Sequence, residues 1–228
     1  KEYYYLGGYL KFPAQSATGV IDELWTKAVV LDDNSGRGKV VFIALDAMGF
    51  ANADVRLVRE GLKEIAKNHN IVSINVSVTH THSGIDLQGV WDNTVGNVLS
   101  NITLGALGLT ELKSGVDRKF LNTIIDQTAK SIKDAYADMK TGKLELAKMD
   151  IGSEYLRDRT APYNYDGNMY RLEFTPDQKG ATPTMITTFG VHPENSGFGH
   201  TVISADFIPY TEQVLNDAGY NFIFIQGI

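Results

Sequence analysis

The apolar residues in the first half of the chain fall into short runs that predict β-strands. Residues 26–31 and 40–45 are rich in β-branched and other apolar residues, and the stretch 32–38 between them, Asp-Asp-Asn-Ser-Gly-Arg-Gly, favours a turn. These three segments predict a β-hairpin. Residues 71–78 alternate apolar and small polar residues, as expected for a strand with one buried face.

Helical periodicity is clear in two segments. Apolar residues recur at helical spacing over residues 55–66, after Asn52 or Asp54, either of which can cap a helix. The Asn-His-Asn sequence at 68–70 predicts the end of this helix. Residues 116–139 carry apolar side chains on one face and Lys and Asp on the other, which predicts a long helix packed against a core.

The second half of the chain continues to mix strands with helices. We expect strands at residues 144–151, 169–174, 184–189 and 221–225, and a helix at 209–217 that begins with a proline. A length of 228 residues without internal repeats is enough for one sizeable domain. We therefore predict an α/β fold, with residues 1–228 forming a single domain in which helices flank a mixed β-sheet.

Composition and charge narrow the range of partners and ligands. Charged residues make up 21% of the chain and give a net charge of -6 without a basic cluster, so nucleic acid is not an expected partner. No apolar run approaches the roughly 20 residues that cross a bilayer. The chain contains no cysteine, so a bound metal must be held by His, carboxylate or Tyr side chains.

Two histidines follow the predicted strand at 71–78. They lie two residues apart in Thr79-His80-Thr81-His82-Ser83-Gly84, so on an extended backbone both rings leave the same face and can converge on one ion or substrate. Neutral imidazole is a common zinc ligand, and neighbouring hydroxyls can hydrogen-bond its second nitrogen. The alternative interpretation is a pair of hydrogen-bonded surface histidines.

His192 is the third candidate ligand. It follows the predicted strand at 184–189 and precedes Pro193, so it also lies at a strand end and can meet His80 in space. The remaining candidates are weaker: His69 lies at a helix end and His200 in a Gly-rich stretch, and we interpret both as structural or solvent-facing.

Several charged residues near strand ends have both a functional and a structural interpretation. Asp46 ends the strand at 40–45, where its carboxylate could orient a ligand imidazole or cap the following helix. Arg157 and Arg159 follow another strand, and Arg can hold a carbonyl or an oxyanion, although a surface salt bridge is the alternative. Residues 204–206, Ser-Ala-Asp, are expected to cap the helix at 209–217.

The hexapeptide at 79–84 resembles the Thr-His-Thr-His-Ser-Gly motif of the neutral/alkaline non-lysosomal ceramidase family. The resemblance covers most of the chain, from Ile-Asp-Glu-Leu-Trp at 21–25 to Val-His-Pro at 191–193 and Ile-Ser-Ala-Asp at 203–206. Order and spacing are similar to those of the family's N-terminal catalytic domain.

This resemblance implies zinc-dependent hydrolysis of an amide, which for ceramide yields a fatty acid and a sphingoid base. By similarity, His80 and His192 would bind zinc, and His82 would contact the reacting group and assist proton transfer. Arg159 would polarise the carbonyl as the family's active-site arginine. The implied partner is a small-molecule or lipid amide, and a lipid substrate also allows peripheral contact with a membrane.

Two departures from the family pattern leave the substrate open. Ile85 stands where the family usually has Pro, and residues 86–92 do not repeat its Gly-rich continuation. The family's remaining zinc ligands, a Glu and a Tyr, and a serine important for activity would lie beyond Ile228. We therefore expect the chain to be a piece of the domain, truncated at both ends.

Two other functions are compatible with the same residues. One is an amidohydrolase, which also opens its metal site with His-x-His, although the order of elements here does not repeat eight times as a (β/α)₈ barrel requires. The other is a noncatalytic domain that binds a lipid or glycan on the same fold. The family is mostly secreted or surface-exposed, so we expect an extracellular or cell-surface location.

Overall fold

A computed structural model describes residues 4–9, 14, 16–91, 94–108, 115–152, 154–155, 158 and 161–227 of the chain. The strands are β1 (Gly19–Val20), β2 (Thr26–Leu31), β3 (Lys39–Leu45), β4 (Ile71–Val78), β5 (Gly142–Asp150), β6 (Asn168–Pro176), β7 (Thr184–Phe189), β8 (Val202–Ile203) and β9 (Asn221–Gln226). The helices are α1 (Asn52–Gly61), α2 (Lys63–Asn68), α3 (Thr94–Ala106), α4 (Arg118–Ala137) and α5 (Ile208–Asp217).

The predicted hairpin is confirmed and provides two strands of a three-stranded sheet. Strands β2 and β3 pair antiparallel, with Thr26 opposite Leu45, and β4 pairs parallel with β3. In the turn, the Asp32 carboxylate accepts a hydrogen bond from the backbone N–H of Asn34 at 2.8 Å. Asn34 itself has a φ of 56°, a left-handed conformation that Asn tolerates better than most residues.

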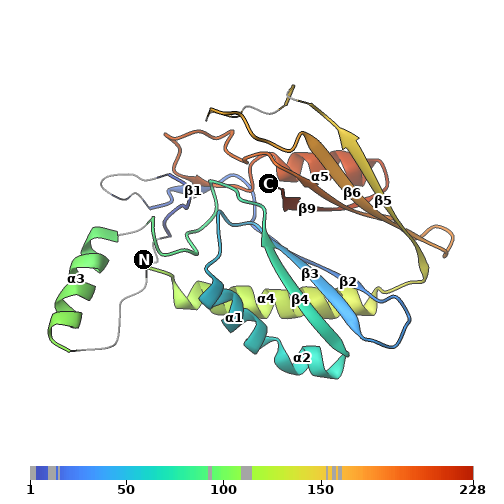
Figure 1. Cartoon of the computed structure of the whole chain (residues 1–228), viewed down its shortest axis with the longest axis horizontal. Coiled ribbons are helices and arrows are strands. Elements are labelled where there is room, and N and C mark those ends of the chain that lie inside the picture. The colour runs from blue at the N-terminus through green and yellow to red at the C-terminus, as the bar shows by residue number, and fades with distance from the viewer. Residues whose placement is uncertain are drawn as a thin grey trace.

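Helices α1, α2 and α4 cover the three-stranded sheet (Figure 1). The long helix α4 begins as its sequence predicts, because the Asp117 side chain caps it by accepting from the backbone N–H groups of Lys119 and Phe120. The expected cap of α1 is wrong: Ala51 occupies the cap position without a side-chain bond. Asp54 is instead buried and accepts a hydrogen bond from Arg118 at 2.8 Å.

A second sheet contains the later strands in the order β5-β6-β7-β9, with α5 packed against β9 (Figure 1). Strands β5, β6 and β7 pair antiparallel, whereas β7 and β9 run parallel, which requires the crossover that α5 provides. The buried residues Phe189, Ile208, Phe222 and Phe224 form its core.

The predicted α/β class is confirmed, but backbone pairing divides the strands into three sheets. The third sheet is the short parallel pair β1-β8, which joins the N-terminal segment to residues 202–203. Strands β4 and β9 are in contact without pairing, so the two larger sheets lie side by side as separate hydrogen-bonded units. This arrangement differs from a closed (β/α)₈ barrel.

No helix in the described part of the chain is long and apolar enough to cross a membrane.

Asp46 comes directly after β3 and is tied to the start of β2. Its carboxylate accepts a hydrogen bond from the backbone N–H of Trp25 at 2.8 Å, and its own N–H donates to the Trp25 carbonyl at 3.0 Å. Burial raises the pKa of Asp46 to about 6, although the Trp25 N–H and the charge of Lys27 favour the ionised form. The charged form of Asp46 is therefore a cost to folding at neutral pH.

The core of the three-stranded sheet gives a direct test of packing. Leu62, between α1 and α2, is fully buried, whereas Leu57 on α1 is 46% exposed. We expect Leu62→Ala to lower the free energy of unfolding by about 2–5 kcal/mol because it leaves a cavity. The matched change Leu57→Ala should alter it by about 0.5 kcal/mol or less. Chemical denaturation of both variants measures the difference, and equal effects would contradict the described packing.

The raised pKa of Asp46 predicts a pH-dependent stability. The folded protein holds this proton more tightly than the unfolded chain, whose carboxyl has a pKa near 3.8. The protonated Asp46 carboxyl therefore makes its full contribution to folding stability below pH 3.8. This contribution is lost as the pH rises through about 6. Relative to Asp46→Asn, which cannot ionise, the wild type should lose up to about 3 kcal/mol of unfolding free energy between acidic and neutral pH. Denaturation of both proteins across this range tests it, and a constant difference would contradict it.

Candidate metal centre

The loops that follow β3, β4 and β7 meet at one edge of the fold. The loop after β4 is bonded to the loop after β3 by two backbone hydrogen bonds, from Thr79 N–H to the Leu45 carbonyl at 2.8 Å and from His80 N–H to the Ala47 carbonyl at 2.9 Å. It is bonded to the loop after β7 by the N–H of His82, which donates to the Pro193 carbonyl at 3.0 Å. The site is thus assembled from both larger sheets.

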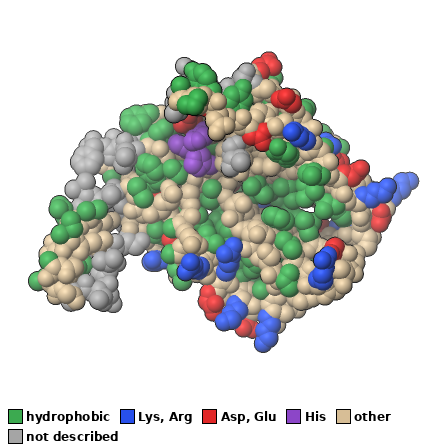
Figure 2. Space-filling view, in the orientation of Figure 1, with side chains coloured by type: hydrophobic (Ala, Val, Ile, Leu, Met, Phe, Trp, Pro, Cys, Tyr) green, Lys and Arg blue, Asp and Glu red, His purple; other side chains and the backbone are tan. Residues whose placement is uncertain are grey.

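These loops bring His80, His82 and His192 together. The ring centroids of His80 and His192 are 4.5 Å apart, those of His80 and His82 5.0 Å, and those of His82 and His192 5.2 Å. On the surface, the histidines form one compact patch (Figure 2). The predicted convergence of the three rings is therefore present in the structure.

The backbone reason for this convergence differs from the predicted one. Strand β4 ends at Val78, so the histidines do not lie on an extended strand. His80 instead adopts a left-handed conformation with a φ of 66°, which is uncommon for a residue other than glycine. Such strain is held by the surrounding structure and is frequent at functional sites. Thr81, fully buried, supports the turn by donating to the Ser204 carbonyl at 2.9 Å.

The ring nitrogens are spaced for a shared metal ion. One nitrogen from each histidine lies within 4.8 Å of the other two. The Nε2 atoms of His80 and His82 are 3.4 Å apart. Two nitrogens at about 2.0–2.1 Å from a tetrahedral metal are separated by about 3.3 Å, so the nitrogens of His80 and His82 are spaced to share one ion. His192 is exposed and leaves the site open to solvent on its side.

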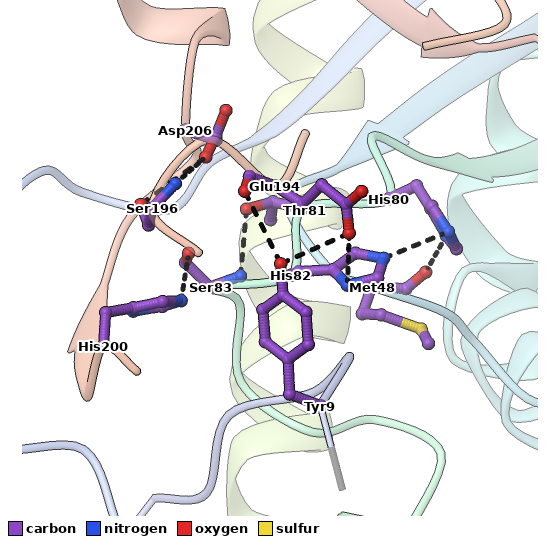
Figure 3. Close-up of polar contacts among 10 residues, drawn as sticks. All are labelled: Tyr9, Met48, His80, Thr81, His82, Ser83, Glu194, Ser196, His200 and Asp206. Carbon is purple, nitrogen blue, oxygen red and sulfur yellow. Dashed lines mark hydrogen bonds and ion pairs between the residues drawn. The ribbon is translucent and has the colours of Figure 1, made fainter. Parts of the chain in front are cut away.

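The protonation state of His80 follows from its partner. Its Nδ1 lies 2.6 Å from the carbonyl oxygen of Met48, which can only accept a hydrogen bond (Figure 3). The proton of the neutral ring is therefore on Nδ1, and the lone pair of Nε2 faces the other histidines. A backbone carbonyl that fixes the tautomer in this way is a usual feature of metal-binding histidines.

The electrostatics favour neutral rings. Burial, reinforced by the neighbouring His80 and His192, lowers the pKa of His82 to about 4. Burial also lowers the pKa of His80, with a further contribution from His192. Neutral imidazole is the form that binds a metal, so these residues need not lose a proton to do so near neutral pH.

Glu194 and Tyr9 complete the surroundings of His82, and the sequence analysis missed both. The Glu194 carboxylate lies 3.7 Å from His82 Nδ1 and accepts a hydrogen bond from the Tyr9 hydroxyl at 3.2 Å (Figure 3). The Tyr9 ring packs edge-on against His82 with centroids 5.0 Å apart. A glutamate two residues after a candidate ligand histidine was the available signal for this contact.

Of the two interpretations of His200, structural or solvent-facing, its contacts agree with the structural one. Its Nε2 is 3.1 Å from the hydroxyl of Ser83, the residue after His82, and the side chain is partly buried (Figure 3). It is therefore bonded within the fold and does not face solvent freely. The expected cap at 204–206 is also different: Phe207 takes the cap position of α5 without a side-chain bond, while the Asp206 carboxylate accepts from the Phe207 N–H.

Of three further predicted residues, one makes a different contact from the expected one and two lie outside the described residues. The hydrogen bond that orients His80 comes from Met48, two residues after Asp46, while the Asp46 carboxylate bonds to Trp25. Its assignment as the group that orients a ligand imidazole therefore has no contact to support it among the described residues. Arg157 and Arg159 lie outside the described residues, so the carbonyl-polarising role of Arg159 stays a prediction.

Comparison with known proteins agrees with this geometry. Residues 4–220 match the family described as neutral/alkaline non-lysosomal ceramidase, N-terminal. A neutral ceramidase of Oryza sativa subsp. japonica is 24% identical over 206 residues, which cover 84% of this chain and 24% of the rice protein.

Two solved structures share the fold over nearly the whole chain. The neutral ceramidase of Pseudomonas aeruginosa superimposes with a TM-score of 0.73 at 22% identity, covering 99% of this chain and 36% of that one. A ceramidase complexed with C2 gives a TM-score of 0.75 at 21% identity, covering 99% and 35%. The chain thus spans about a quarter to a third of the length of these relatives. By the family match, which extends over most of its length, this chain belongs to the neutral/alkaline non-lysosomal ceramidase family and corresponds to its N-terminal part.

Proposed function

We propose that this protein is a zinc-dependent hydrolase that cleaves the amide bond of ceramide or a related N-acyl lipid. The observation that carries the proposal is the cluster of three imidazoles with nitrogens within 4.8 Å of one another. Membership of the ceramidase family and the match to a ceramidase complexed with C2 support the choice of substrate. The products would be a fatty acid and an amine.

The donor set fits zinc. Imidazole nitrogens suit zinc, copper, iron and nickel, and catalytic zinc sites commonly use histidines with one position left open. By the resemblance to the family we assign His80 and His192 as the ligands in this chain. Their ring centroids lie 4.5 Å apart, and the Met48 carbonyl fixes the orientation of His80. When bound, zinc would supply a Lewis acid that polarises a carbonyl and lowers the pKa of water.

His82 is assigned to proton transfer. Its ring is 7% exposed, its pKa is lowered to about 4 by burial, and its Nε2 faces the cluster 3.4 Å from His80. A neutral imidazole at this position can accept a proton from water at neutral pH and return it to the departing amine. Tyr9 packs against both His82 and Phe198, which shields this side of the site from solvent.

Two assignments come from the family alone. By its resemblance to the family's arginine, Arg159 would stabilise the negative charge that develops on the carbonyl oxygen. The extracellular or cell-surface location and the peripheral membrane contact stay predictions from the same resemblance.

Metal content tests the ligand assignment. In the full-length protein, which would also supply the family's remaining ligands, we expect about one zinc ion per chain and loss of that zinc in His80→Ala and in His192→Ala, because each change removes a ligand. His69→Ala is the matched control. His69 packs against the Tyr136 ring with centroids 4.1 Å apart and is not one of the three clustered histidines. Elemental analysis of the four proteins gives the answer. A metal-free wild type would contradict the mechanism and favour a noncatalytic lipid-binding domain.

Turnover tests the role of His82. We expect the zinc-loaded full-length protein to release fatty acid from a short-chain ceramide, and His82→Ala to slow this by about 100-fold or more while keeping its zinc. The slower rate would reflect loss of the proton-transfer group. Product release measured by chromatography, with metal content measured on the same samples, separates the two effects. Loss of zinc in His82→Ala would make His82 a third ligand instead.

A further inference from the structure

We propose that Glu194 is the positioning residue of His82. Its carboxylate would accept a hydrogen bond from His82 Nδ1–H and so turn the Nε2 lone pair of His82 toward His80 and His192. This inference rests on the proposed function for its catalytic meaning, but the geometry behind it is independent of turnover. Glu194 Oε2 lies 3.7 Å from His82 Nδ1, on the side of the ring opposite to the contact with His80 (Figure 3).

The first argument is the burial of His82 Nδ1. His82 is 7% exposed, and its Nδ1 is buried with no hydrogen-bond partner among the residues that the structure describes. Leaving a buried polar nitrogen unpaired is unfavourable, so native structures usually provide a partner. The Glu194 carboxylate faces this nitrogen and can satisfy it after a small movement.

The second argument is that Glu194 is itself held in place. The Tyr9 hydroxyl donates to Glu194 Oε2 at 3.2 Å, and the peptide before Glu194 is anchored because the Pro193 carbonyl accepts the His82 N–H at 3.0 Å.

The backbone next to Tyr9 also lies against the His82 ring. Gly8 has a φ of +108°, and a Cβ there would meet His82 Cγ at 2.6 Å, so only glycine allows this approach.

The third argument concerns the tautomer of His82. His80 carries its proton on Nδ1, because that atom faces the Met48 carbonyl. A His82 protonated on Nε2 could donate to His80 Nε2 at 3.4 Å, but its bare Nδ1 would then face the Glu194 carboxylate, which repels a lone pair. Protonation on Nδ1 replaces this repulsion with attraction to the carboxylate. The two Nε2 lone pairs then face each other at 3.4 Å, which is a weaker repulsion because neither nitrogen carries a net charge. Glu194 therefore selects the tautomer that can bind metal or accept a proton.

The separation of 3.7 Å is longer than a hydrogen bond, and this is compatible with the role. Hydrogen bonds between catalytic side chains are often long in free enzymes and tighten when substrate binds. Carboxylates that orient histidines act in the same way at serine hydrolase and zinc sites, where they fix the tautomer and stabilise the charge that develops.

The test combines ring-nitrogen NMR with kinetics. In the metal-free protein labelled with ¹⁵N-histidine, we expect His82 to carry its proton on Nδ1, and Glu194→Ala to shift it to Nε2. The His82 signals are identified by their loss in His82→Ala. In the zinc-loaded protein, Glu194→Ala should lower kcat by about 10–100-fold with KM little changed. Glu194→Gln should restore much of the rate and the Nδ1–H tautomer, because its carbonyl oxygen can still accept.

Glu145→Ala serves as the control, since Glu145 is an exposed residue on β5, and we expect it to change neither the tautomer nor kcat. Unchanged His82 tautomer in Glu194→Ala would overturn the proposal even if the protein lost activity. Loss of zinc from Glu194→Ala with the tautomer unchanged would make Glu194 a metal ligand, which also overturns it. The NMR measurement needs neither metal nor substrate, so its failure is distinct from failure of the proposed hydrolase activity.

Discussion

The site depends on backbone hydrogen bonds that join loops from two sheets with no strand pairing between them. Strands β4 and β9 touch but do not pair, so the N–H of His82 donating to the Pro193 carbonyl is a direct link between the two units at the histidines. The bond from His80 N–H to the Ala47 carbonyl adds the loop after β3. A movement of one sheet relative to the other would therefore change the distances among the three imidazoles.

Burial decides the charge of this cluster. Two protonated imidazoles with centroids 4.5 Å apart, as in His80 and His192, would repel by roughly 4 kcal/mol at an effective dielectric constant of 20. Burial and this mutual repulsion act in the same direction, and together they lower the pKa of His80 and of His82. The same arrangement that makes three adjacent cations unfavourable provides neutral nitrogens for one metal cation.

The sequence predicted what depends on local pattern, and it failed where distant segments decide. The hairpin of β2 and β3 and the strand β4 follow from apolar runs and a turn, and three histidines at strand ends indicated one site. Local pattern did not reveal the division into separate sheets, which depends on pairing between distant strands. It also did not reveal helix α3 or the two-residue strands β1 and β8. It also placed the wrong cap on α1, because Asp54 is bound by Arg118 from another helix. Glu194 was missed because its role depends on contacts with Tyr9 and His82, far away in sequence.

The contact between Gly8 and His82 makes the N-terminal segment a structural part of the site. Residues 5–7 are bonded to the loop after His82, through Gly7 N–H to the Gly84 carbonyl at 2.9 Å and Asp86 N–H to the Tyr5 carbonyl at 2.8 Å. Trimming the chain past residue 9 would remove this cover and admit water to the buried face of the His82 ring. An affinity tag or fusion partner is therefore better joined away from this end of the chain, since a displacement of this segment reaches the His82 ring directly through the Gly8 contact.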